Sequence, residues 1–504
     1  MFNKAINWMK GVMAKVGLIK KLEQVTDHKK INLSDSYYEN ILKWRALHQG
    51  YYSKMHDVHY QTIEGPQKRE MATMNMPKMA TQELATLIFN ERCEITVSDD
   101  GFNEFIQEVF KNNAFNGNFQ QYLEFMFAQG GMVIKPYVVD GKLKLSYVTA
   151  DCFLPISWDN TRITEGVFIS EISRQGKKYT HLEWHTFEDP NYKVEVPKYI
   201  IKNELYESTN SQDLGTKVAL STLFPKLAEI VPLENVKRPL FAYFKPNLAN
   251  NVDSTVPLGI SIYANSYDTL KSIDIAFDSF QREFRLGRKR IIVPTSAIRE
   301  VVNPKTGHSH RYFDATDEAY EALDTNMDDN KITEINSELR VEEHIAAINA
   351  LLNWYAMQTG FSPGAFSFDG QSMKTATEVV SEQSKTFRTK QSHENVIEQG
   401  IADLIECIGV VAQIYGLYTP PEKYDVTCQF DDSIAEDATA EINKQVLLLT
   451  NGLQSKIDAI MKIYGITSEE AEAKLKKIKD ESQIGEEDVI DFFAKNKGGK
   501  KDEV

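Results

Sequence analysis

The chain has 504 residues, 42% of them hydrophobic, which is ordinary for a folded protein with several cores. Its 72 acidic and 57 basic residues give a formal charge of −15. Such an acidic chain is not expected to wrap nucleic acid by neutralising phosphates, although nucleic acid could still slide past it. The four cysteines lack Cys-x-x-Cys spacing, which argues against a disulfide framework or a zinc site.

Residues 1–22 predict a basic amphipathic helix. Lys10 and Lys15 interrupt the unbroken apolar run that a secretory signal would need. No run of about eighteen apolar residues occurs in the chain, so neither a membrane-spanning helix nor a stable membrane association is expected. We prefer a docking helix or a partner-binding arm. The alternative is a helix that lies on a membrane surface, in a membrane-bound scaffold.

The N-terminal half predicts helices followed by an antiparallel sheet, which is an α+β pattern. The helices are expected at 33–48, 77–91, 102–110 and 119–127, the last two separated by Asn-Gly turn chemistry. Two β-rich runs, 132–139 and 142–148, are joined by Asp140-Gly141, a strong hairpin signal. Further strands are expected at 166–173, 178–187, 194–206 and 240–245.

One strand raises the possibility of an enzyme. His181, Glu183 and His185 alternate with apolar residues, so on a strand all three would point to one face and could hold a metal ion. A strand with a polar outer face gives the same pattern, and we prefer that interpretation. No nucleotide-binding loop, zinc-protease motif or serine-hydrolase motif occurs in the chain, so no enzyme and no cofactor are expected.

Residues 260–286 predict a helix with an aromatic-rich apolar face and a charged opposite face. The insertion that follows, 287–337, divides by charge into a basic and then an acidic part. The candidate contact residues are Arg285, Arg288, Lys289, Arg290 and Arg299 on the basic side, and Glu318 and Glu321 on the acidic side. The insertion is either a solvated subdomain with weak ion pairs or a head-to-tail contact between copies of the chain.

Residues 341–415 predict a helix, a loop and a much longer helix. Apolar residues at helical spacing run from Val341 to Tyr355, and Gly360 to Gly364 cannot continue that helix. A capping box at Thr375 opens a proline-free stretch of about forty residues, or roughly 60 Å of helix. A strand is expected at 426–430. Short helices are expected at 434–451, 455–464, 467–480 and 485–495.

This order of elements resembles that of the portal proteins of tailed bacteriophages. Residues 360–378, GFSPGAFSFDGQSMKTATE, look like the tunnel loop of that family and the start of its long helix. The resemblance implies a predominantly helical α+β chain with a wing, a stem, a clip and a crown. The implied parts are the wing at 1–259, stem helices at 260–286 and 338–358, the clip at 287–337, the tunnel loop at 359–374, the long wing helix and strand at 375–432, and the crown at 433–504.

The resemblance also implies a function. Portal proteins form a closed ring, of twelve copies in this family, at one capsid vertex, and double-stranded DNA is packaged and ejected through it. The implied partners are a terminase, a head-completion or adaptor protein, and the major capsid and scaffolding proteins. The implied location is the virion, after assembly in the host cytoplasm.

The resemblance places the candidate DNA contacts in and beside the tunnel loop. The residues expected to contact DNA or to anchor the tunnel loop are Phe361, Phe366, Phe368, Gln371, Lys374 and Arg388, and for the phenylalanines we prefer anchoring. The competing function is a metal-dependent hydrolase that uses His181, Glu183 and His185.

Overall fold

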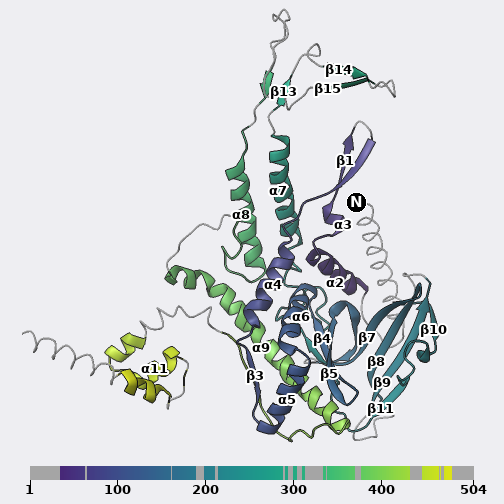
Figure 1. Ribbon diagram of the computed structural model, residues 1–504, viewed down its shortest axis with the longest axis vertical. Coiled ribbons are helices and arrows are strands. Elements are labelled where there is room, and N and C mark those ends of the chain that lie inside the picture. Colours follow the sequence, from purple (N-terminus) through teal and green to yellow (C-terminus); the bar gives the residue numbers. More distant parts are fainter. Residues whose placement is uncertain are drawn as a thin grey trace, which may run out of the picture.

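The protein is a mixed α/β chain in which helix exceeds strand (Figure 1). A computed structural model describes residues 35–62, 65–159, 162–188, 198–209, 214–287, 290–292, 299–302, 309–312, 333–335, 338–368, 376–431, 445–464, 466 and 470–478. None of the helices in this part of the chain is both long enough and apolar enough to cross a membrane. The predicted amphipathic helix at 1–22 lies outside the described residues.

The four helices predicted in the first part of the chain are confirmed. They are α2 (Asp35–His48), α4 (Met76–Ile88), α5 (Asp100–Asn112) and α6 (Phe115–Gln129), with a single turn, α3 (Ser53–His56), between the first two. The predicted Asn-Gly break is wrong, because Asn116 and Gly117 lie in the first turn of α6. The chain turns instead at Asn113, whose amide donates to the carbonyls of Val109 and Leu143 and so ties this turn to the neighbouring sheet.

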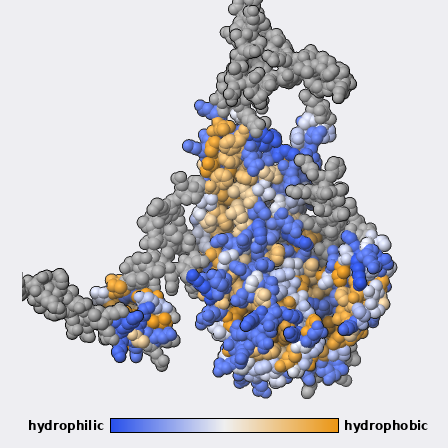
Figure 2. All heavy atoms as spheres, viewed as in Figure 1, coloured by the Kyte–Doolittle hydropathy of each residue, from blue (hydrophilic) through white to orange (hydrophobic). Residues whose placement is uncertain are grey.

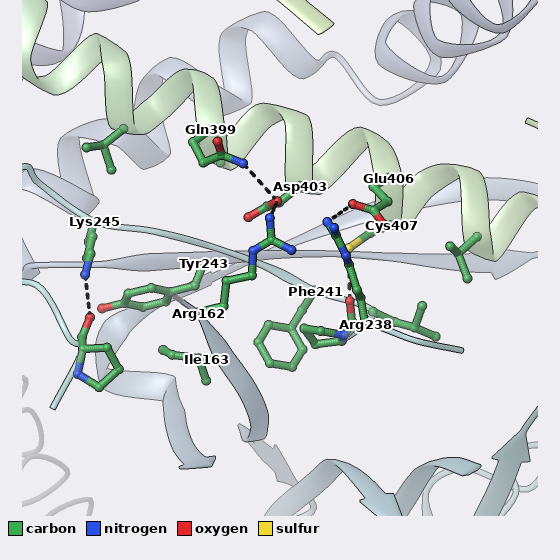
Figure 3. A pocket seen from close by; sticks show the side chains of 16 residues that line it. Arg162, Ile163, Arg238, Phe241, Tyr243, Lys245, Gln399, Asp403, Glu406 and Cys407 are labelled. Carbon is green, nitrogen blue, oxygen red and sulfur yellow. Dashed lines mark hydrogen bonds and ion pairs between the residues drawn. The ribbon is translucent and has the colours of Figure 1, made fainter. Parts of the chain in front are cut away.

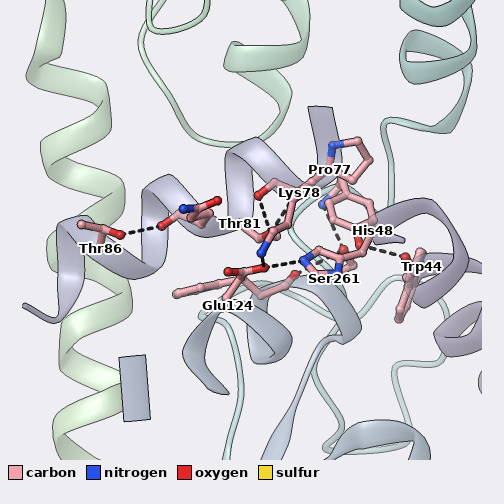
Figure 4. Close-up of polar contacts among 11 residues, drawn as sticks. Trp44, His48, Pro77, Lys78, Thr81, Thr86, Glu124 and Ser261 are labelled. Carbon is pink, nitrogen blue, oxygen red and sulfur yellow. Dashed lines mark hydrogen bonds and ion pairs between the residues drawn. The ribbon is translucent and has the colours of Figure 1, made fainter. Parts of the chain in front are cut away.

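A carboxylate stabilises the packing of three of these helices. Glu124 on α6 accepts hydrogen bonds from His48 on α2 (2.7 Å) and from Lys78 on α4 (Figure 4). Burial alone would raise the pKa of Glu124, but these two donors outweigh burial and lower the pKa. Glu124 therefore stays ionised and links elements that are far apart in the sequence.

The predicted hairpins are also confirmed. β4 (Met132–Val139) pairs with β5 (Lys142–Thr149), and both turn residues have positive φ, 49° at Asp140 and 71° at Gly141. β12 (Ala242–Phe244) adds to the other edge of β4. A larger antiparallel sheet has the order β10-β9-β8-β7-β6, with β11 also paired to β9. Its strands are β6 (Phe153–Trp158), β7 (Ile163–Arg174), β8 (Lys177–Glu188), β9 (Lys198–Ser208), β10 (Thr216–Val218) and β11 (Ile230–Leu233).

Two strand pairs were not foreseen. β1 (Asp57–Thr62) and β2 (Gly65–Glu70) form a hairpin that contacts the helix at 267–286. The strand predicted at 426–430 exists as β17 (Val426–Gln429), but its partner is β3 (Glu94–Val97) from the first quarter of the chain. This pairing of distant segments joins the C-terminal end of the main body to its N-terminal helices.

Three long helices follow the sheets. α7 (Tyr267–Leu286) begins seven residues later than the predicted start at 260. The segment before it is held away from helical geometry, because Ile262 N–H donates to the Phe127 carbonyl at the end of α6 (3.1 Å). α8 (Val341–Gln358) lies alongside α7, and α9 (Ala376–Ile414) crosses the body against β4, β12 and α4 (Figure 1). The 39 residues of α9 confirm the predicted long helix, about 58 Å at 1.5 Å per residue.

Short strands occupy the insertion between α7 and α8. β13 (Arg290–Ile292) pairs with β16 (Thr333–Ile335), and β14 (Arg299–Val302) pairs with β15 (Ser309–Tyr312). In the C-terminal part, α11 (Lys456–Tyr464) and the helical residues 445–450 and 470–478 agree with three of the predicted short helices. The predicted helix at 485–495 lies outside the described residues.

Candidate functional site

The loop after α8 leaves from a fixed helix end. Gly360, with φ of 90°, directly follows the C-cap residue Thr359. Phe361 N–H then donates to the Ala356 carbonyl at 2.8 Å, which is the long hydrogen bond of a Schellman motif. Because a residue with a β-carbon adopts this backbone only at a cost, Gly360 sets the direction in which the loop departs.

Three phenylalanines attach the loop to the surrounding helices. Phe361 and Phe366 are only 2% and 8% exposed, and their rings pack edge to face with centroids 5.0 Å apart. Phe368 is half-buried, with its ring 5.8 Å from that of Phe280 on α7. The sequence left open whether these rings contact DNA or anchor the loop. The burial of Phe361 and Phe366 favours anchoring, whereas Phe368 is only half-buried. Contact of these residues with DNA stays a prediction.

Two asparagine side chains of α8 accept hydrogen bonds from the loop backbone. Asn353 Oδ1 accepts from the Gly364 amide at 2.7 Å, and Asn349 Oδ1 accepts from the Phe368 amide at 2.8 Å. Sequence reasoning missed both residues. The available signal was a pair of amide side chains four residues apart, which places them on one flank of a helix otherwise described by its apolar stripe.

The long helix holds the loop from the other side. Ser362 N–H donates to Thr386 Oγ1 at 2.9 Å, and Thr386 N–H donates back to Ser362 Oγ at 3.2 Å. Arg388, a predicted contact residue, is exposed on α9 two residues further along. Gln371 and Lys374 lie outside the described residues. We call residues 359–368, fixed by α8 and α9 together, the loop root.

The α7–α8 pair exposes an apolar surface. Arg340, just before α8, forms a two-pronged ion pair with Glu283 on α7, both N–O distances being 3.1 Å. Figure 2 shows an apolar band on one side of the pair, along α8. The exposed large apolar side chains on or beside them are Ile275, Phe284, Leu339, Trp354 and Met357. Trp354 is 53% exposed, although a side chain of this size is usually well buried.

The opposite, polar face of α7 binds the segment that follows β2. Asp278 accepts two hydrogen bonds from the Arg69 guanidinium, at 2.7 and 2.5 Å. Asp274 accepts from His56 Nε2 (3.1 Å), from Thr73 Oγ1 (2.9 Å) and from the Met74 amide (2.9 Å). The charged face predicted for this helix is therefore buried at Asp274 and Asp278, whereas Asp268, Lys271 and Arg282 are exposed. These contacts attach the β1–β2 hairpin to α7.

Only some of the predicted contact residues of the insertion lie in the part of the chain that the structure describes. Arg285 is exposed near the C-terminal end of α7, where it lines an open groove of about 500 Å³ together with Arg69 and Arg282. Arg290 and Arg299 lie in β13 and β14. Arg288, Lys289, Glu318 and Glu321 lie outside the described residues.

The predicted polar outer face of the strand at 178–187 is wrong, because β8 is an interior strand buried on both faces. His185 donates from Nε2 to Glu183 (2.8 Å) and accepts at Nδ1 from the Tyr199 hydroxyl (2.7 Å). Lys135 binds the other oxygen of Glu183, and His181 is bonded to Asn203 at 3.0 Å. Burial lowers the pKa of both histidines, which favours the neutral ring.

This arrangement leaves no set of ligands for a metal. In the part of the chain that the structure covers, no group of three histidine, cysteine or acidic side chains is placed to hold an ion. The hydrolase alternative therefore has no support from the geometry.

A small cavity lies between α9 and the sheets (Figure 3). Arg162 pairs with Asp403 at 2.9 Å, and Arg238 pairs with Glu406. Burial raises the pKa of Asp403 although Arg162 opposes that effect. At about 110 Å³ the cavity is below the usual size of a ligand site, roughly 300 Å³ or more. The two ion pairs hold α9 against the sheets, and the remaining charged group, Lys245, donates to the Pro257 carbonyl.

The site is thus a fixed loop root beside a helix pair with an uncovered apolar surface. Residues 20–486 match the family model described as phage portal protein, SPP1 Gp6-like. The chain therefore belongs to the phage portal protein family, whose members are structural proteins of the virus head.

The other comparisons add little. No protein with a curated function matches the sequence. One solved structure found by comparison is the neck of an empty GTA particle computed with C6 symmetry. It has 11% sequence identity and a TM-score of 0.40, and the alignment covers 78% of this chain and 89% of that one. At this TM-score the family assignment depends on the sequence match alone.

Proposed function

We propose that twelve copies of this chain form the ring-shaped channel of a phage head, through which double-stranded DNA is packaged and ejected. The observation that carries the proposal is the uncovered apolar surface of the α7–α8 pair. Monomeric proteins rarely leave such a surface in water, and head-to-tail contact between identical copies closes into a ring when the rotation allows. In this proposal α7 and α8 are the stem helices, and the insertion between them is the clip.

The ring is tested with Trp354→Asp. Because Trp354 is 53% exposed, the substitution should leave the subunit folded while placing a charge in the contact between copies. The matched control is Leu248→Asp, at another exposed apolar residue outside the helix pair. Mass photometry and negative-stain microscopy should show rings for the control and folded single subunits for Trp354→Asp. Rings of normal yield from Trp354→Asp would overturn the proposal.

We further propose that the part of the loop beyond its root, residues 369–374, projects into the channel and contacts DNA. The root supports this role, because its last residue, Phe368, is fixed by Asn349 on α8 and packs against Phe280 on α7, so the loop starts from a defined point on the helix pair. Gln371, Lys374 and Arg388 are the proposed contacts, while Phe361, Phe366 and Phe368 anchor the root. The acidic balance of the chain favours passage of DNA over tight binding.

A deletion of residues 369–373 tests this second step while leaving every anchoring contact of the loop root in place. Rings should assemble normally, and filled heads should fall in number or lose their DNA. Packaging and retention at normal yield would show that the loop has no such role.

The remaining partners follow from the position of a portal in the head. The clip is proposed to bind the terminase during packaging and an adaptor protein afterwards, and the wing to meet capsid and scaffolding proteins. Arg282 and Arg285 are exposed and line a groove whose third arginine, Arg69, is already paired with Asp278. These two exposed arginines suit an acidic segment, such as the acidic half of the insertion in a neighbouring copy. Arg285→Glu should weaken rings most at low salt, where unscreened charges act furthest. The complete virion, assembled in the host cytoplasm, is the proposed location.

A further inference from the structure

An apolar-rimmed groove lies at the C-terminal end of α9. It encloses about 420 Å³ between β4, the segment 227–233 that includes β11, and the last turn of α9. Each of these three elements contributes large exposed apolar side chains to its lining. They are Tyr137 and Val139, Leu227, and Ile414 and Tyr415. Tyr415 is 58% exposed, so the rim stands open to solvent without any described segment over it. We call this feature the outer groove.

The floor of the outer groove is polar, but its charges are already paired. Glu183 accepts from Lys135 and from His185, and His185 is oriented by Tyr199. The ammonium of Lys135 also lies 4.4 Å from the centre of the Phe168 ring. A charged ligand would have to break these contacts. The floor therefore suits an uncharged occupant that adds at most a few hydrogen bonds.

The dimensions indicate a peptide. A volume of about 420 Å³ holds a few large side chains. The exposed rim extends on three sides of that volume, so the occupant must be larger than the cavity and cover the rim as well. DNA is excluded as the occupant, because phosphates would meet apolar side chains and an internally neutral floor. Tyrosines at the edge of an apolar pocket are typical of protein interfaces.

The position of the groove indicates where the peptide comes from. The loop root contacts α9 at Thr386, and the groove lies at Ile414, 28 residues further along, or roughly 40 Å along the helix axis. Figure 1 shows the two regions at different parts of α9, with β11 near its C-terminal end. If the loop faces the channel, as proposed above, the outer groove lies away from the channel wall and on the outside of the ring.

We propose that the outer groove binds an apolar, uncharged peptide segment of a protein that surrounds the ring in the phage head. This inference rests on the proposed function, because it takes its direction from the channel-facing loop. The three exposed sides of the rim would be covered by that segment, and ring assembly would not require it.

The test uses phage whose portal gene carries Val139→Asp or Tyr415→Asp. Both residues are exposed, so each substitution puts a charge on the rim without disturbing the core. Val252→Asp, at an exposed apolar residue outside the groove, is the matched control. Ring formation is measured first, by mass photometry of the purified variants. Both rim variants should form rings as the control does, while the number of portal rings per purified head should fall at least tenfold.

A photo-crosslinker placed at position 415 identifies the occupant in assembled heads. The expected product joins Tyr415's position to an apolar peptide of another head protein, located by mass spectrometry. A product that joins two portal subunits would overturn the inference and assign the groove to a second copy of the chain. Heads that incorporate both rim variants as well as the control would also overturn it. Failure of the rings themselves would instead contradict the proposed function, and the first measurement separates these outcomes.

Discussion

The loop root makes a sharp prediction at its two glycines. Gly360 and Gly364 have nearly the same φ, 90° and 85°. A β-carbon at Gly364 would meet nothing within 4 Å, whereas one at Gly360 would lie 2.6 Å from Thr389 Cγ2 on α9. Alanine at either position costs about 1–2 kcal/mol for left-handed backbone. At Gly360 the clash adds about 1–3 kcal/mol, because the β-branched Thr389 has little rotamer freedom.

Hydrogen exchange of the assembled ring measures this difference locally. Peptides that cover 355–368 report the free energy of opening of the loop root, and each 1.4 kcal/mol changes the exchange rate about tenfold. Gly364→Ala should raise the rate by about 5–30-fold, and Gly360→Ala by about 30–5,000-fold. Adding Thr389→Ala to Gly360→Ala removes the clashing methyl group and should restore the rate to that of Gly364→Ala.

Two results would contradict the predicted clash between a β-carbon at position 360 and Thr389. Equal exchange in Gly360→Ala and Gly364→Ala would mean that α9 does not press on the loop root. The same conclusion would follow if Thr389→Ala left the Gly360→Ala rate unchanged, since a double-mutant cycle isolates the contact between the two residues.

Three further predictions concern the buried polar groups. Burial lowers the pKa of His393 from 6.5 to about 4, so its neutral form stabilises the fold above pH 6.5 and that stability is lost as the pH falls towards 4. His393→Asn should therefore remove about 2 kcal/mol of acid destabilisation between pH 7.5 and 5, seen as a smaller drop in Tm. Asp278→Ala should release Arg69 and destabilise the β1–β2 hairpin by about 1–3 kcal/mol, with faster proteolysis there as the readout. Burial raises the pKa of Cys407, so iodoacetamide at pH 8 should label it only after unfolding.

Local patterns in the sequence were sufficient for most elements of the fold. The hairpin turn at Asp140-Gly141 and the helix α9 follow from the chemistry of neighbouring residues, and both were predicted correctly. The wrong predictions occur where contact with a segment distant in the sequence determines the local structure. The start of α7 is delayed by a hydrogen bond to Phe127, which is 135 residues earlier than Ile262. β8 has the alternation of a half-exposed strand, yet β7 and β9 pair with both of its edges and the histidine side chains of its polar face are buried as well.

The candidate site shows the same division. A break in the apolar stripe and the run from Gly360 to Gly364 were enough to locate the loop between its two helices. Nothing local indicated that Asn349 and Asn353 would hold that loop, because their partners are backbone amides that every residue other than proline possesses. The outer groove was missed for another reason. Tyr137, Leu227 and Tyr415 come from three separate stretches of the sequence, and only the folded chain brings them to one rim.

The buried carboxylates explain why the chain suits a structural role. A catalytic carboxylate needs a free oxygen to accept a proton or bind a metal ion. Asp274, Asp278 and Glu183 each accept two or more hydrogen bonds, and in every case one donor comes from a segment at least 40 residues away. Breaking such a contact leaves a polar group without its partner, at a cost of about 1–3 kcal/mol. The same contacts that withdraw these groups from chemistry thus hold α7 and β8 in place, which a subunit needs if it is to keep its shape while DNA moves past it.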